Sequence, residues 1–233
     1  MYRLVDESRA IVLVEAEELE GFFVSPGDDV PEVVFRRANL SDERPRQVED
    51  AVLEIVNGRR DKVGEYLVGR VIFGDVEPER VAFRFFGDRC EFSEAAGIWR
   101  RWGSGPPLRA GEWLRLPVGH HPAWLHVVQN SWFATGHGSG GGADAEVLTL
   151  NGASVVTKAG FYCALGEAAR GPGGYFGSNL DALADCLRSG SAGKRRARLL
   201  WNGFFSSEEA LGTEFLDAVT AVLEEFGVIV EAR

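Results

Sequence analysis

Cysteine is scarce in this sequence, and no long apolar run interrupts it. The 233 residues include three cysteines, Cys90, Cys163 and Cys186, and none of them forms a CxxC pair. An odd number of widely spaced cysteines argues against a disulfide scaffold and favours small buried thiols in a reducing compartment. No apolar stretch approaches the roughly 18 residues of a membrane-spanning helix, and the N-terminus, MYRLVDESRA, is too charged for a signal peptide. We therefore expect a cytoplasmic protein.

Basic residues are also too few to balance the acidic ones. The formal net charge is −10 at pH 7, which argues against nucleic-acid binding because phosphate contacts need clustered Lys and Arg. Two motifs, FRFFG and IWRRW, combine aromatic residues with arginine and can build a stacking platform for bases. In so acidic a chain they are better interpreted as core residues with a polar rim. The charge favours a basic partner.

A stretch rich in glycine divides the chain. The segment TGHGSGGGADAE separates two regions rich in apolar residues, and such a composition is typical of a flexible linker. We therefore predict a β-rich domain over residues 1–138, a linker over 139–145, and a second domain over 146–233. With 45% hydrophobic residues, the chain can bury a substantial core.

The first domain is predicted to be an α+β domain rich in antiparallel strands. β-Branched and aromatic residues dominate residues 9–24, 51–74 and 80–87, and Asn57-Gly58 is a strong hairpin signal. One helix is expected from Ser93 through Trp102, with Ser93 as its N-cap. The pattern assigns no role to this domain.

The second domain alternates strands and helices. We expect strands at 147–152, 197–201 and 228–232, and helices at 157–170, 179–187 and 206–227. This order predicts an α/β domain with a small three-stranded parallel sheet and crossover helices.

The stretch GPGGYFGSNLDALADCL combines a glycine-rich turn, two aromatics and an acidic helix. The glycines set the direction in which Tyr175 and Phe176 emerge, and Asn179 is the expected N-cap. Asp181 and Asp185 are four residues apart and share one helix face, where like charges slightly destabilise an isolated helix. Two interpretations stay open: a solvated acidic face, or a functional surface. A catalytic carboxylate pair is less favoured, because no histidine lies nearby in the sequence.

Four motifs carry a family resemblance. They are TKAGFYCALGEA, GYFGSNLDALADCL, LLWNGF and the end of the last helix at Glu224-Glu225-Phe226-Gly227. With them, residues 147–232 resemble barstar, the family of intracellular inhibitors of a secreted bacterial ribonuclease. The resemblance implies that the loop and second helix block the active site of a small basic microbial ribonuclease, as an immunity protein, with no catalysis and no cofactor.

The resemblance also implies individual roles. Tyr175 would pack at the rim of the enzyme's base-binding cleft, Asp185 would enter its phosphate-binding site, and Asp181 would lie beside it. Glu225 matches a more peripheral acidic contact on the last helix. The partner-binding set that the resemblance implies comprises Tyr175, Phe176, Gly177, Asn179, Asp181, Ala184, Asp185 and Glu225.

Three positions depart from the family pattern. Phe176 replaces a second tyrosine, Ser178 stands where the prototype is acidic, and Ala184 stands where it has a tryptophan. A smaller contact surface and one carboxylate fewer indicate a different ribonuclease partner or weaker binding.

The histidines and the first domain raise other possible functions. All four histidines lie between positions 120 and 137, but their spacing lacks the Cys or acidic ligands of a zinc finger, so we predict no metal site. Trp124, His126 and Val128 alternate as on one face of a half-buried strand. A hydrolase that uses His126 in the first domain is one alternative function. The other is an adaptor whose barstar-like domain binds a partner that is not a nuclease.

Overall fold

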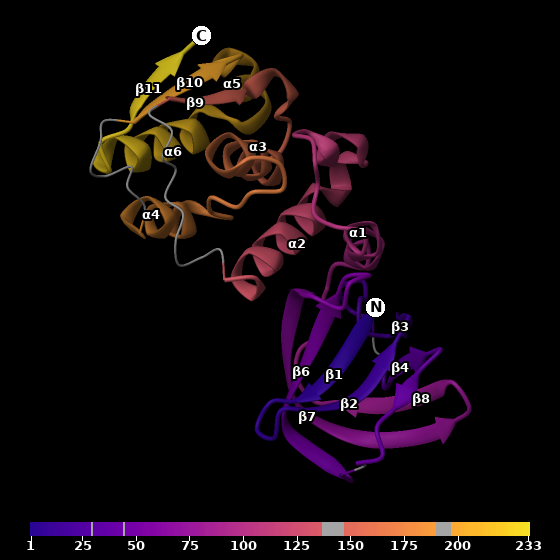
Figure 1. Cartoon of the computed structure of the whole chain (residues 1–233). Helices are drawn as coiled ribbons and strands as arrows, with labels where there is room; N and C mark the ends of the chain where they lie inside the picture. Colours follow the sequence, from indigo (N-terminus) through magenta and orange to yellow (C-terminus); the bar gives the residue numbers. More distant parts are fainter. Residues whose placement is uncertain (29, 44, 137–146, 190–196) are drawn as a thin grey trace. The chain divides into compact units, whose positions relative to one another are not determined.

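The computed structural model describes residues 1–28, 30–43, 45–136, 147–189 and 197–233. It divides the chain into two compact units, Met1–Gly105 and Pro106–Arg233 (Figure 1). The predicted linker at 139–145 and the predicted boundary at 138 both lie outside the described residues. Residues 106–136 thus group with the C-terminal segment, although the sequence pattern placed them in the first domain.

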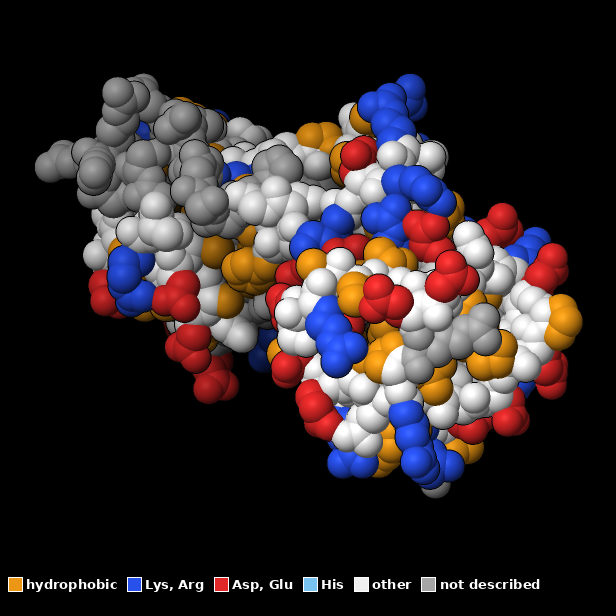
Figure 2. Space-filling view, turned by 60° about the horizontal axis from the view of Figure 1, so that its bottom comes forward, with side chains coloured by type: hydrophobic (Ala, Val, Ile, Leu, Met, Phe, Trp, Pro, Cys, Tyr) orange, Lys and Arg blue, Asp and Glu red, His pale blue; other side chains and the backbone are white. Residues whose placement is uncertain are grey.

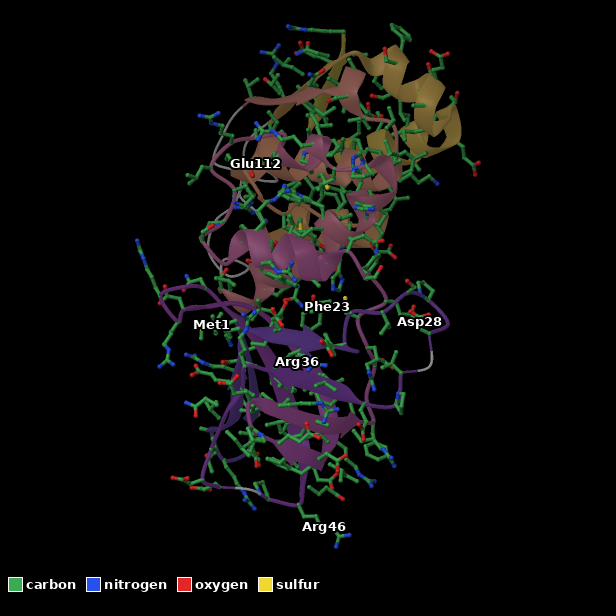
Figure 3. The ribbon with its side chains drawn as sticks, turned by 90° about the vertical axis from the view of Figure 1, so that its right-hand side faces the viewer. Met1, Phe23, Asp28, Arg36, Arg46 and Glu112 are labelled. Atoms are coloured by element: carbon green, nitrogen blue, oxygen red, sulfur yellow. The ribbon has the colours of Figure 1, made fainter. Side chains whose placement is uncertain are left out.

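The first unit is an eight-stranded sheet in the order β3-β4-β8-β7-β6-β1-β2-β5. Every strand pairing in it is antiparallel, as the sequence predicts. Met1 and Phe23 lie toward one end of the sheet and Arg46 lies at the other (Figure 3). The strands are β1 (Tyr2–Asp6), β2 (Ile11–Ala16), β3 (Glu18–Glu20), β4 (Val33–Arg36), β5 (Asn39–Leu40), β6 (Gln47–Val56), β7 (Lys62–Glu77) and β8 (Arg80–Phe85).

The hairpin between β6 and β7 turns at the predicted Asn57-Gly58. The Asn57 side-chain oxygen accepts hydrogen bonds from the backbone N–H of Arg59, at 2.8 Å, and of Asp61, at 3.0 Å. These bonds replace strand pairing within the turn, which is why asparagine is favoured there. The hairpin prediction is confirmed.

Aromatic side chains of the first unit pack in its core. Phe83 is fully buried, and Trp99 and Trp102 are 1% and 3% exposed on helix α1 (Ala95–Trp102). The aromatic residues of FRFFG and IWRRW are therefore buried, with the exception of Phe86, which is 51% exposed. Helix α1 matches the predicted helix, but the prediction that Ser93 caps it is wrong: Glu94 occupies the N-cap position, without a side-chain cap.

Ion pairs cross the outer surface of the sheet. Arg3 contacts Glu15 at 2.5 Å, and Arg36 contacts Glu20 at 2.5 Å. The Arg36–Glu20 pair is about half exposed, and exposed pairs contribute little stability, about 0–1 kcal/mol each, whereas Arg3 and Glu15 are largely buried. Basic and acidic side chains are interspersed on the face of the molecule that Figure 2 shows.

The second unit contains the predicted parallel sheet, in the order β11-β10-β9. Helix α3 packs against β9 and helix α6 against β11, while α4 packs on α6 away from the strands (Figure 1). The α/β prediction is confirmed. The elements are β9 (Val147–Asn151), α3 (Lys158–Arg170), α4 (Leu180–Ser189), β10 (Arg198–Asn202), α5 (Phe204–Leu211), α6 (Thr213–Glu225) and β11 (Ile229–Ala232).

The long helix predicted over 206–227 is two helices. Helix α5 ends before Gly212, whose φ of +85° lies in the left-handed region, and α6 begins after it. Left-handed backbone interrupts an α-helix, and glycine adopts it without steric cost. Apolar residues recur at helical spacing on both sides of Gly212, so the sequence pattern did not indicate the break.

The strand predicted around Trp124 is helix α2 (His121–Ala134). Trp124 and Val128 are buried, but so are Leu125 and Val127, which an alternating strand would place on the opposite face. Pro122 stands in the first turn, where proline is favoured in helices. Two short 3-10 helices, η1 (Glu112–Arg115) and η2 (Val118–His120), lead into α2.

A buried hydrogen-bond chain closes the core of the second unit. The Phe161 ring stacks on Trp201, with centroids 5.1 Å apart, and the Trp201 indole N–H donates to the Ser207 hydroxyl at 3.1 Å. Ser207 in turn donates to the carbonyl of Gly152 at 3.1 Å. Middle strand β10 is thereby joined to α5 and to the turn after β9.

Substitution Ser207→Ala is expected to destabilise the protein by about 1–3 kcal/mol, because it leaves the buried Trp201 indole N–H without its acceptor. Urea unfolding followed by tryptophan fluorescence measures the change. An unchanged midpoint and slope would contradict this role.

Candidate protein-interaction site

A glycine-rich loop connects α3 to α4 and lies flat against α3. Gly171 ends α3 with a φ of +83°. A Cβ atom added at Gly166, in the middle of α3, would overlap the carbonyl oxygen of Gly174. Glycine at 166 is therefore required for this close approach. The loop is held on the helix surface rather than projecting from it.

The Glu167 carboxylate fixes the loop and the segment before α2 to the same helix. It accepts hydrogen bonds from the backbone N–H of Gly111 at 2.7 Å, from the Trp113 indole N–H at 3.2 Å and from the backbone N–H of Gly173 at 3.4 Å. Burial raises the pKa of Glu167, and the three hydrogen bonds partly oppose that rise. One half-buried side chain thus joins three segments.

The two aromatics of the loop point into the molecule. Tyr175 is 2% exposed and Phe176 is 1% exposed. The Tyr175 hydroxyl lies 3.3 Å from the Ser178 hydroxyl, and its ring packs against Phe133 of α2, with centroids 5.7 Å apart. The Arg170 guanidinium lies over the rings of Trp132 and Phe176, at 5.1 and 5.6 Å. Neither loop aromatic presents its ring to a partner in this conformation.

Gly177 and Asn179 turn the chain into α4. Gly177 has a φ of +100°, and a Cβ there would lie 2.8 Å from the backbone nitrogen of Leu183, so it is buried and sterically constrained. The Asn179 side-chain oxygen accepts the backbone N–H of Ala182 at 2.8 Å. Asn179 is therefore the N-cap, as predicted, and it fixes the start of α4.

The acidic face of α4 is exposed. Leu183 and Leu187 are buried beneath the helix, whereas Asp181 and Asp185 face solvent and Ala184 is half-buried. Asp185 forms an ion pair with Arg188 at 2.5 Å, and both side chains are mostly exposed, by 73% and 65%. Asp181 stands in the first turn, where the helix dipole favours a carboxylate. Asp185 and Arg188 are three residues apart in the sequence, a spacing at which helical side chains can form an ion pair.

Glu225 is exposed at the end of α6, which packs against α4. The last turns of the two helices approach each other, since the Arg188 guanidinium lies 5.7 Å from the ring centre of Phe226. Of the predicted set, the structure exposes Asn179, Asp181, Asp185 and Glu225, and it buries Tyr175, Phe176 and Gly177.

Sequence reasoning missed the contribution of α2. Phe133 of this helix packs on Tyr175 of the loop, and Trp132 contacts Arg170 at the end of α3. Trp113, before the helix, donates to Glu167, which also holds the loop. The adjacent Trp-Phe pair was visible in the sequence, but assigning the segment to a strand of the first domain separated it from the loop.

The histidines do not form a metal site among the described residues, where no group of three or more metal-ligating side chains occurs. The His121 ring packs edge-on against Trp113, with centroids 4.9 Å apart, and its Nδ1 lies 3.4 Å from the Thr157 hydroxyl. Burial lowers the pKa values of His121 and His126. His126 lies on α2, in the second unit, and His137 lies outside the described residues.

Comparison with known proteins addresses the region that contains this site. Residues 145–232 match the model of the family described as Barstar (barnase inhibitor). The C-terminal region is barstar-like. The N-terminal region matches no family model, and no curated protein matches the chain. Helix α2, which covers Tyr175, lies before the matched residues.

Substitution Glu167→Gln tests how the loop is held, because the variant keeps the side-chain shape but cannot ionise. The pKa of Glu167 is raised above its ordinary value of 4.5 in the folded state, so the folded protein binds its proton more tightly than the unfolded chain. Protonation of Glu167 therefore stabilises the folded protein. This contribution to the unfolding free energy is fully present below the pKa of Glu167 in the unfolded chain, and it is lost as the pH rises through the pKa of Glu167 in the folded protein.

We therefore expect the difference in unfolding free energy, wild type minus Glu167→Gln, to be larger near pH 4 than at pH 7. Urea denaturation at a series of pH values measures it. A difference that stays constant, or grows toward neutral pH, would contradict the assigned environment of Glu167.

Proposed function

We propose that the C-terminal unit binds a small basic ribonuclease and blocks its active site. Two observations support this function. The family that residues 145–232 match is described as an inhibitor of such an enzyme, and residues 106–233, with 10 basic and 13 acidic side chains, carry a formal net charge of −3, which suits a basic partner. The proposal concerns residues 106–233 and assigns no role to the first unit.

The observation that carries the proposal is the exposed carboxylate pair on α4. An enzyme that cleaves RNA presents cationic groups to a phosphate, and a carboxylate held in a fixed position can occupy that place. The Asn179 cap and the buried Leu183 and Leu187 fix the helix that carries Asp181 and Asp185. The pair therefore needs little ordering on binding, which favours affinity.

The Arg188 partner of Asp185 does not oppose this function. Both side chains of the pair are mostly exposed, and exposed ion pairs contribute about 0–1 kcal/mol. A cationic group of the ribonuclease can replace Arg188 at small cost, because Arg188 can return to solvent.

We propose binding without catalysis, so the chain needs no catalytic residue and no cofactor. As an immunity protein it would act in the cytoplasm of the bacterial cell that synthesises the ribonuclease, where rapid capture protects the cell's own RNA. Electrostatic attraction between an acidic inhibitor and a basic enzyme raises the rate of that encounter.

A second candidate function is an adaptor that binds a partner other than a nuclease. The burial of Tyr175 and Phe176 favours it, because the aromatic contacts that the family resemblance implies are turned inward. Such a partner would still meet the acidic face of α4.

Substitution Asp185→Ala is expected to weaken ribonuclease binding at least thirtyfold. A loss of about 2–5 kcal/mol is typical when one member of a charge pair is removed and leaves its buried partner unpaired. The measurement titrates the full chain into a guanyl-specific microbial ribonuclease and follows RNA cleavage. Glu209→Ala, which removes one exposed carboxylate from α5, is the matched control.

Stoichiometric inhibition by the wild type and by Glu209→Ala, with inhibition lost in Asp185→Ala, would support the proposal. Absence of inhibition at micromolar wild-type protein would reject it for this class of nuclease and favour the adaptor function.

A further inference from the structure

The end of helix α2 places an exposed aromatic ring over the buried Tyr175. Phe133 is 60% exposed, whereas the Tyr175 ring that it contacts is 2% exposed. The family resemblance implies that Tyr175 contacts the partner. In this chain Tyr175 is buried, and the ring of Phe133 that packs on it faces solvent. An approaching partner would therefore meet Phe133 first.

Helix α2 is a fixed part of the second unit and not a displaceable lid. It packs along α3, and its Trp124 and Val127 are 1% and 0% exposed. The segment before it is held by the hydrogen bonds of Gly111 and Trp113 to Glu167. To uncover Tyr175, a partner would have to break this packing and these hydrogen bonds together.

The C-terminal end of α2 is fixed as well. The Arg170 guanidinium lies between the ring of Trp132 and the ring of Phe176, and so joins α2 to the loop. Phe133 follows Trp132 directly and rests on Tyr175. An aromatic side chain held in this way loses little conformational entropy when a partner covers it.

Phe133 packs on the loop that leads directly into the acidic helix α4. The Tyr175 hydroxyl lies 3.3 Å from the hydroxyl of Ser178, which directly precedes the Asn179 cap of α4. The Phe133 ring packs on the same tyrosine. An exposed aromatic ring on the loop that leads into an acidic helix has the composition of a binding hot spot, in which an aromatic anchor is accompanied by charged groups.

We propose that Phe133 is the aromatic contact residue of the ribonuclease-binding surface, supplied by a helix outside the barstar-like residues. The inference rests on the proposed function. The partner it fits presents cationic groups next to an apolar surface, as the active site of an enzyme that stacks RNA bases and binds phosphates does. Phe133 then supplies apolar contact and specificity, while Asp181 and Asp185 supply charge.

Substitution Phe133→Ala in the full chain tests this role. We expect its affinity for the guanyl-specific ribonuclease, measured by calorimetric titration, to fall at least tenfold below that of the wild type. Phe205→Ala is the matched control, because Phe205 is 72% exposed on α5, and we expect it to bind as the wild type does. Phe133→Tyr keeps the ring and is expected to retain affinity within about threefold.

The outcomes separate this inference from the function on which it rests. If the wild type binds and Asp185→Ala weakens binding, but Phe133→Ala binds like the wild type, the role of Phe133 is overturned and the proposed function stands. If the wild type does not bind, both are overturned. Urea unfolding of each variant verifies that it is folded; if Phe133→Ala is not, Phe133→Glu decides, and wild-type affinity in that variant overturns the inference.

Discussion

The arrangement of the second unit depends on one half-buried carboxylate. Glu167 accepts hydrogen bonds from the segment before α2, through Gly111 and Trp113, and from the loop before α4, through Gly173. Few side chains can do this, because two carboxylate oxygens offer several acceptor sites in a small volume. Burial raises the pKa of Glu167, and the hydrogen bonds that it accepts partly oppose that rise by favouring the carboxylate.

Because the loop is held against α3, its aromatic side chains are buried while the carboxylates of the helix that follows stay exposed. The aromatics Tyr175 and Phe176 are buried, with Tyr175 packed against Phe133 of α2 and Phe176 beneath Arg170 of α3, and the carboxylates of α4 face solvent. Gly166 makes this possible, because any larger residue would push the loop off the helix. The same packing that completes the core of the unit thereby removes two aromatics from its surface and leaves the charge exposed.

The sequence predicted most of the fold and part of the site. Local signals were sufficient at Asn57 and Asn179, where one residue decides a turn or a cap, but they failed at Ser93, which does not cap α1. They also failed at Trp124–Val128, because a short apolar run fits both a strand and a buried helix. The role of α2 in the site could not be predicted, since Glu167 contacts Trp113 across 54 positions of sequence and no local pattern records such a pair.

Charge and shape have different tasks on such a surface. Carboxylates such as Asp181 and Asp185 attract any cationic partner, so by themselves they discriminate poorly between basic proteins. Discrimination requires an apolar group that fits one partner and excludes others. In this chain the exposed aromatic that packs on Tyr175 belongs to α2, outside the matched residues. Under the proposed function, discrimination between partners comes from a segment outside the matched residues, while the acidic helix α4 supplies the charge.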